Sequence, residues 1–158
     1  MRLGKCLRYA HPAVFVIALT AMSYIPTLLW LFVEDGLGVP DISWVPVPDI
    51  ADYGAGILFF LTVVFAPLFE TLVFQTFFYF ILSKIPYFRR HRGWIVLISA
   101  MVFGANHFYS LFYIVWAGMV GALFMWGYII RRYRKGFWLI VATHALINLI
   151  AFVYQLIF

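Results

Sequence analysis

Residues 57–82 read ILFFLTVVFAPLFETLVFQTFFYFIL, an apolar run of 26 residues with one acidic side chain, that of Glu70, and no basic one. A transmembrane α-helix needs about 20 consecutive apolar residues, so this run is long enough to span a bilayer. Glu70 is also the only acidic residue after Asp52. Because a carboxylate inside a membrane is costly, Glu70 is predicted to have a functional role.

The composition of the whole chain is typical of an integral membrane protein. Hydrophobic residues make up 66% of the 158 residues and charged residues 11%, whereas soluble domains carry about 25% charged residues. The single cysteine, Cys6, excludes an internal disulfide. The net charge of +5 does not indicate nucleic-acid binding, because all 11 Lys and Arg residues lie in three short clusters between apolar runs. We interpret these clusters as topology signals.

The clusters and the apolar runs together predict an all-α, polytopic helical bundle with about five transmembrane helices. The predicted spans are Pro12–Val33, Tyr53–Ser83, Trp94 to about Tyr109–Leu111, a fourth that follows a very short turn and ends at Arg131, and Phe137–Phe158. Five crossings place every basic cluster on one side and the acidic, Pro-rich segment Glu34–Asp52 on the other. The positive-inside rule then predicts a cytoplasmic amino terminus and a carboxyl terminus outside.

Two alternatives to this topology are less consistent with the sequence. Arg2–Ser23 resembles a cleavable signal sequence, but its apolar run continues well past the small residues at Ala21–Ser23, which favours an uncleaved helix. A β-barrel is disfavoured because the runs are continuously apolar and lack alternation. The many Phe, Trp and Tyr residues are expected to be chiefly lipid-facing or interfacial.

Two histidines are candidates to lie near Glu70. Glu70 is 14 residues before Lys84 and His107 is 14 residues after Gly93, which places both about 21 Å from the basic side at 1.5 Å per residue. His144 and Asn148, counted from Gly136, come to about 12 Å and about 18 Å. Helix tilt would be needed to bring His144 level with Glu70.

These residue types fit hydrolysis of a peptide bond. Burial and neighbouring donors tune the basicity of a carboxylate, so Glu70 is a candidate general base acting on water. An imidazole nearby can orient that water, and further donors can stabilise an oxyanion. His144 and Asn148 are spaced i, i+4, which puts them on one helical face.

Three short strings resemble the motifs of the CPBP family of intramembrane proteases, which includes the CAAX prenyl endopeptidases and the bacterial Abi proteins. The strings are Ala66–Gln75 (APLFETLVFQ), Phe103–His107 (FGANH) and His144–Asn148 (HALIN). They resemble, in order, the family's Glu-Glu-x-x-x-Arg motif after a proline, its Phe-x-x-x-His motif and its His-x-x-x-Asn motif. The order and the placement on the second, third and fifth predicted helices are similar to the family core.

The resemblance implies roles for individual residues. Glu70 would activate water with help from His107, and His144 and Asn148 would stabilise the oxyanion. Thr71 stands where the family usually has its second glutamate and Gln75 where it has arginine. The remaining motif residues are expected to bind substrate or support the site: Thr71, Phe74, Gln75 and Phe103.

No cofactor is predicted, although a metal remains an alternative. Glu70, His107 and His144 could supply the three protein ligands of a catalytic zinc. A water activated by glutamate needs no metal, however, and the prediction commits to none. The expected partners are membrane lipids and a peptide or protein substrate at the membrane, with no nucleic acid.

The predicted function is that of an intramembrane endopeptidase. Residues 1–52 would form an N-terminal transmembrane helix with an acidic extracytoplasmic loop, and residues 53–158 a CPBP-like four-helix catalytic core. The expected location is a bacterial inner membrane. The alternatives are a non-catalytic CPBP-like membrane factor, a haem protein with histidine ligands and a small proton-coupled transporter.

Overall fold

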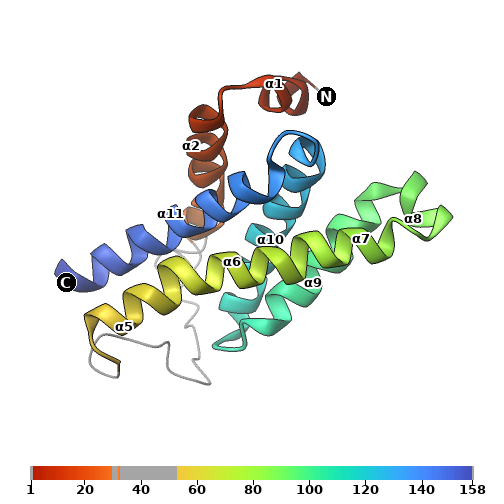
Figure 1. Ribbon diagram of the computed structural model, residues 1–158. Coiled ribbons are helices and arrows are strands. Elements are labelled where there is room, and N and C mark those ends of the chain that lie inside the picture. The colour runs from red at the N-terminus through yellow and green to blue at the C-terminus, as the bar shows by residue number, and fades with distance from the viewer. Residues whose placement is uncertain (1, 30–31, 33–52, 158) are drawn as a thin grey trace.

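The computed structural model describes residues 2–29, 32 and 53–157, and every regular element in this part of the chain is helical (Figure 1). The acidic segment Glu34–Asp52 lies outside the described residues. The elements are α1 (Arg2–Tyr9), α2 (Pro12–Ser23), α5 (Ala55–Phe59), η1 (Phe60–Phe65), α6 (Ala66–Glu70), η2 (Thr71–Phe77), α7 (Phe78–Leu82), α8 (Pro86–Arg90), α9 (Arg92–Asn106), α10 (Leu111–Arg131) and α11 (Gly136–Ile157). The predicted all-α membrane bundle is confirmed.

Four helical stretches of the described chain are long and apolar enough to span a membrane. They are Pro12–Leu29, Ala55–Leu82, Leu111–Arg131 and Gly136–Ile157. The third predicted span, which begins at Trp94, corresponds to α9, which has only 15 residues and is therefore about 22 Å long. It ends because His107 leaves the helical conformation and the Ser110 hydroxyl caps α10 by accepting from the Tyr113 N–H. α9 thus ends directly before His107, one of the residues predicted to be functional.

The long helix from Ala55 to Leu82 is not uniformly α-helical. Two π-helical stretches, η1 and η2, flank the five-residue helix α6, whose last residue is Glu70. Such π-helical insertions are rare and occur frequently at functional sites. Pro67 lies in the first turn of α6 and has no N–H to donate to the preceding turn. The conformation of this helix is therefore unusual on both sides of Glu70.

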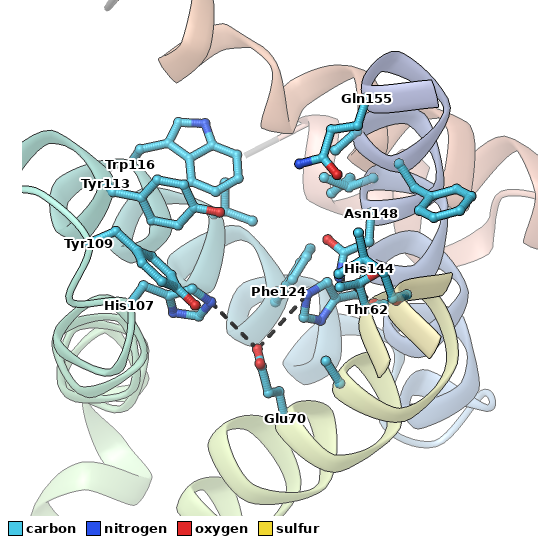
Figure 2. Close-up of a pocket in the computed structure, with 16 residues that line it drawn as sticks. Thr62, Glu70, His107, Tyr109, Tyr113, Trp116, Phe124, His144, Asn148 and Gln155 are labelled. Carbon is cyan, nitrogen blue, oxygen red and sulfur yellow. Dashed lines mark hydrogen bonds and ion pairs between the residues drawn. The ribbon is translucent and has the colours of Figure 1, made fainter. Parts of the chain in front are cut away.

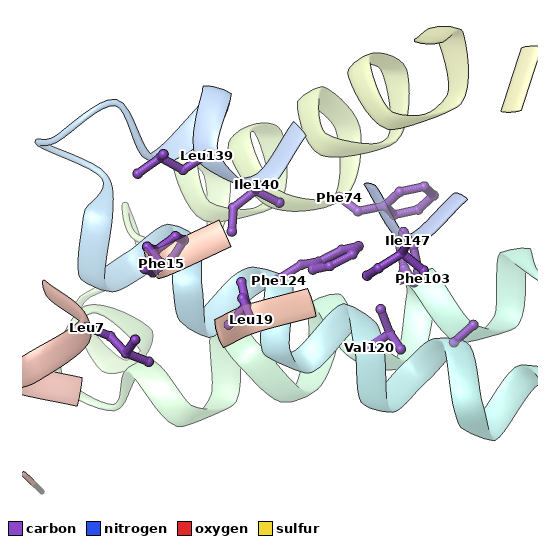
Figure 3. Close-up of a cluster of buried hydrophobic side chains, with 11 residues drawn as sticks. Leu7, Phe15, Leu19, Phe74, Phe103, Val120, Phe124, Leu139, Ile140 and Ile147 are labelled. Carbon is purple, nitrogen blue, oxygen red and sulfur yellow. The ribbon is translucent and has the colours of Figure 1, made fainter. Parts of the chain in front are cut away.

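The core joins the N-terminal helices to the rest of the bundle (Figure 3). Leu7, Phe15 and Leu19 pack in one cluster with residues of the later helices. The other buried members are Phe74, Phe103, Ala117, Val120, Phe124, Leu139, Ile140 and Ile147. The buried Arg131 guanidinium fastens this end, because it donates to the carbonyl oxygens of Arg8 (2.9 Å) and Ala10 (2.6 Å). α1 and α2 therefore belong to the same packed unit as residues 53–157.

Helices α9 and α10 approach each other closely through glycine. A Cβ atom placed on Gly104 would lie 2.5 Å from the Ile114 carbonyl oxygen and 3.1 Å from the Gly118 Cα atom. Both neighbours are backbone atoms, so they cannot move aside as a side chain would. Small residues of this kind allow membrane helices to pack at short range.

We expect Gly104→Ala to destabilise the protein. Overpacking of a well-packed interface costs about 1–3 kcal/mol, and thermal unfolding in detergent should show a lower Tm. Gly56→Ala is the matched control, because a Cβ atom there would meet nothing within 4 Å. The control should match or exceed the wild-type Tm, since alanine favours a helix over glycine. A Gly104→Ala protein as stable as the control would contradict this close packing.

Candidate active site

Glu70 lies between two histidines from different helices (Figure 2). Its Oε2 atom is 3.8 Å from His107 Nε2 and 3.9 Å from His144 Nε2. Glu70 ends α6, His107 follows α9 and His144 is in α11. The three ionisable groups that the sequence singled out therefore meet in one place, and His144 is not shallower than His107. Figure 1 shows α11 inclined to α10, and a count along the sequence takes no account of how helices are inclined.

The orientation of His107 is fixed by its own helix. Its Nδ1 atom is 2.8 Å from the Phe103 carbonyl oxygen. Since a carbonyl can only accept, Nδ1 carries the proton of this hydrogen bond. In the neutral ring Nε2 then has a free lone pair, and this is the atom that faces Glu70. His107 is therefore arranged to accept a hydrogen bond beside the carboxylate.

His144 has a different environment. Its side chain is buried, and its ring lies 5.0 Å from the ring of Phe124 and 6.0 Å from that of Phe103, measured between centroids. No described side chain or backbone group bonds its Nδ1 atom. The Nε2 atom is free to carry the proton and point it toward the carboxylate. Beside the Glu70 carboxylate, His107 thus presents a hydrogen-bond acceptor and His144 a hydrogen-bond donor.

Asn148 joins α11 to the first π-helical stretch. In η1 the Ala66 N–H bonds the Leu61 carbonyl, five residues earlier. The next donor in this register would be Pro67, which has no N–H, so the Thr62 carbonyl lacks a backbone donor there. The Asn148 amide nitrogen donates to this oxygen at 2.7 Å. Asn148 therefore makes a structural hydrogen bond and also lines the pocket. The second hydrogen of its amide is available to donate to another group.

Ser99 makes a similar bond to the second π-helical stretch, which follows Glu70. Its hydroxyl donates to the carbonyl of Phe74, within η2, at 2.7 Å. Ser99 is in α9, the helix that precedes His107, whereas Asn148 is in α11 with His144. Each π-helical stretch beside Glu70 is thus bonded to a helix associated with one histidine. These two bonds hold the carboxylate in its place between the rings.

We expect Ser99→Ala to lower stability by about 1 kcal/mol, because polar contacts between membrane helices contribute roughly 0.6–2 kcal/mol each. The measurement is the Tm in detergent. Ser83→Ala is the matched control, since Ser83 lies half-buried at a helix end and makes only a 3.3 Å bond within its own turn. Equal Tm values for the two variants would show that the Ser99 bond does not contribute.

The four predicted supporting residues lie behind the site. Thr71 and Gln75 are fully buried at 0% exposure, and no hydrogen bond is made by the Thr71 hydroxyl or by either polar atom of the Gln75 amide. Phe74 and Phe103 are core residues in edge-to-face contact, with centroids 5.2 Å apart. The Phe103 ring also packs 4.6 Å from that of His107. None of these four residues is among those that line the pocket.

A pocket of about 190 Å³ extends from Glu70 between the long helix, α10 and α11. One wall is formed by the side chains of Tyr109, Tyr113 and Trp116, as Figure 2 shows on the side of His107. The expectation that aromatic residues chiefly face lipid missed this wall. Tyr113 and Trp116 are three residues apart in α10, which puts them on one helical face, whereas Tyr109 lies in the turn before α10. Trp116 is fixed by a 2.8 Å bond from its indole N–H to the Thr27 hydroxyl.

The three ionisable groups are also the residues that would bind a metal. The donor atoms of two ligands on one tetrahedral zinc lie roughly 3.4 Å apart, given zinc–ligand distances of about 2.0–2.2 Å. The separations of 3.8 and 3.9 Å exceed this value. Within the described residues, no group of three or more His, Cys, Asp and Glu side chains is arranged to hold a metal ion. The spacing of the three groups is therefore wider than that of ligands on one zinc ion.

Comparison with known proteins gives one match. The family model described as Type II CAAX prenyl endopeptidase Rce1-like matches residues 53–150. That range contains Glu70, His107, His144 and Asn148, together with the aromatic wall of the pocket. The search of curated proteins and the search of solved structures found no match.

Proposed function

This chain belongs to the Rce1-like family of type II CAAX prenyl endopeptidases, and we propose that it hydrolyses a peptide bond within the membrane by means of a water molecule activated by Glu70. The observation that carries the proposal is the position of one carboxylate oxygen within 4 Å of two imidazole nitrogens, at the end of a pocket. Separations of this length are too long for direct hydrogen bonds and suit a bridging water.

Each group has a distinct part in the proposed reaction. Glu70 takes a proton from the water as its oxygen attacks the peptide carbonyl, and later gives the proton to the leaving amine. His107 accepts a hydrogen bond from the second O–H of the water through Nε2, because its Nδ1–H donates to the Phe103 carbonyl oxygen. His144 donates from Nε2 to the oxyanion. The unused amide hydrogen of Asn148 is a second donor on the same helical face.

The non-catalytic alternative rests on Thr71 and Gln75, where the resemblance leads one to expect a charged pair. Both side chains are fully buried and outside the pocket lining. Replacing glutamate and arginine together leaves no unpaired charge in the core. The substitutions therefore leave the groups that face the pocket unchanged, which favours a functional site.

Haem binding and proton transport are less well supported. Figure 2 shows the Glu70 carboxylate between the two imidazoles, where a haem ligated by both histidines would need its iron. A transporter would be expected to show inverted repeats, and the sequence shows none. Both alternatives also leave the amide and aromatic lining of the pocket without a role.

We propose that catalysis needs no tightly bound metal. Cleavage should then continue after dialysis against EDTA, and zinc added back should not increase it. The measurement is the initial rate before and after chelation, with Tm as a check that the protein stays folded. A rate that falls on chelation and returns with zinc would contradict this proposal.

The experiment that tests the function is mass spectrometry of a peptide library. The library contains prenylated and unmodified carboxyl-terminal peptides, and it is incubated in detergent with the wild type and with Glu70→Gln. Cleavage by the wild type alone would support the proposal and identify the substrate class. Equal cleavage by both proteins would refute the assigned mechanism. Location in a bacterial inner membrane is part of the same proposal.

A further inference from the structure

We propose that the N-terminal helical stretch Pro12–Leu29 sets the affinity of the pocket for its peptide, through the hydrogen bond from Trp116 to Thr27. Trp116 contacts an apolar group of the peptide, and Thr27 is a positioning residue that acts through Trp116. The identity of the ligand as a peptide rests on the proposed function. Thr27 itself lies outside residues 53–150, which match the family model.

The bond between Thr27 and Trp116 joins two segments that are far apart in the sequence. Thr27 lies in the last turn of the stretch Pro12–Leu29, and Trp116 lies in α10. The indole Nε1–H donates to the Thr27 hydroxyl oxygen at 2.8 Å. An indole has one N–H donor and no acceptor, so this bond uses its whole hydrogen-bonding capacity. The orientation of the Trp116 ring is therefore set by a residue of another helix.

The helix that leads to Thr27 is packed tightly against α10. Phe15 and Leu19 of α2 are fully buried in the main core cluster. A Cβ atom placed on Gly127 of α10 would lie 2.9 Å from Leu19 Cδ2 and 3.2 Å from Phe15 Cζ. There is thus no spare space between the two helices at this level. A hydroxyl on a helix that is packed in this way can hold the indole in one orientation.

Trp116 lines the pocket at some distance from the reacting groups. Its ring centroid is 5.2 Å from that of Tyr113, and the Tyr113 ring is in turn stacked 6.0 Å from that of His107. Trp116 is therefore two ring contacts away from His107. Figure 2 shows the indole nitrogen on the side away from Glu70. A peptide group that touches Trp116 accordingly lies beyond the bond that is cut.

The surroundings of Trp116 favour an apolar group. Val120, one turn later in α10, also lines the pocket and is buried. Among the described residues that line the pocket there is no Lys or Arg, and Glu70 is the only carboxylate. A charged group of the peptide beside Trp116 would lose its hydration without gaining a partner. An aromatic or aliphatic group would gain both buried area and contact with the indole ring.

Loss of the Thr27 hydroxyl would change the ring and not the reacting groups. Trp116 is half-buried, and a donor left without its partner costs free energy. The indole would turn to reach water or another acceptor, and it would then present a different surface to the pocket. Because the contact is away from the reacting carbonyl, weaker binding is expected instead of slower chemistry.

Thr27→Val tests this positioning role, since valine has nearly the shape of threonine but no acceptor. KM for a peptide from the library should rise roughly 3- to 10-fold, the value of one aromatic contact, while kcat stays within about twofold. Thr27→Ser keeps the hydroxyl and should retain the wild-type KM. Thr20→Val is the matched control, because Thr20 is buried in the same helical stretch and its hydroxyl has no hydrogen-bond partner in the described chain.

A double variant shows whether Thr27 acts through Trp116. Trp116→Phe should also raise KM, and adding Thr27→Val to it should raise KM no further. Additive effects would overturn the inference, and so would a Thr27→Val protein with the wild-type KM. A Thr27→Val protein whose kcat and Tm fall while KM stays constant would also overturn it, because the bond would then be purely structural.

Peptide retention by Glu70→Gln measures the same affinity without cleavage. The library is incubated in detergent with Glu70→Gln or with Glu70→Gln/Thr27→Val, and the peptides that coelute on gel filtration are identified by mass spectrometry. Glu70→Gln should retain peptides with aromatic or aliphatic residues, and the double variant should retain several times less of them. No retention by Glu70→Gln, or equal retention by both, would overturn the inference. Retention that depends on Thr27, without cleavage by the wild type, would instead count against the proposed function.

Discussion

Glu70→Gln is expected to reduce cleavage by about 10²–10⁴-fold, the usual contribution of a general base. Glutamine has nearly the same size and shape but cannot take a proton from water. The Glu70 Oε2 atom makes no hydrogen bond within the described part of the chain. The substitution therefore breaks no direct bond to a neighbouring helix.

The same variant should be at least as stable as the wild type. A neutral amide is less costly than a carboxylate in a membrane interior, so the Tm in detergent should stay the same or rise. Activity and stability would thus change in opposite directions. Loss of activity together with a large fall in Tm would indicate that Glu70 is structural instead. Glu70→Asp is the control, because it keeps the carboxylate and should keep part of the activity.

His144→Phe is expected to lower kcat by about 10²–10³-fold, the cost of removing one donor to an oxyanion. Phenylalanine keeps a ring against Phe124 and Phe103 but has no N–H to donate. Because the donor is used mainly in the transition state, KM should change little. Steady-state kinetics and Tm measurements on the same preparation check both statements.

His91→Phe is the matched control for this substitution. His91 lies at the exposed basic end and its ring contacts Tyr87, away from the pocket. The control should keep wild-type kinetics. A His144→Phe protein with nearly wild-type kcat would contradict the donor role. A large rise in KM alone would point to substrate binding in place of oxyanion stabilisation.

The sequence predicted the central residues because intramembrane ionisable groups are rare. Glu70 stood alone in an apolar run, and the depth count placed His107 level with it. The same count made His144 shallower, whereas the structure puts its Nε2 atom 3.9 Å from Glu70. Depth along a helix ignores tilt, so the count could not decide this contact.

Other features depended on three-dimensional register. The bond from Asn148 to the Thr62 carbonyl follows from the π-helical turn before Pro67. Pro67 was visible in the sequence, but the register of the turn was not. The length of α9 was overpredicted, because Phe108, Tyr109 and Leu111 continue the hydrophobic pattern although the helix ends at Asn106. The aromatic wall was missed because lipid-facing and pocket-facing aromatic residues have the same hydropathy.

The most direct test of glutamate-activated hydrolysis is mass spectrometry of the cleavage products formed in H₂¹⁸O. The substrate is a peptide identified from the library, incubated with the wild type or with Glu70→Gln. We predict that the wild type forms a new carboxyl terminus with one ¹⁸O atom and that the variant forms little product. Product formed as fast by the variant, or new carboxyl termini without ¹⁸O, would contradict the account.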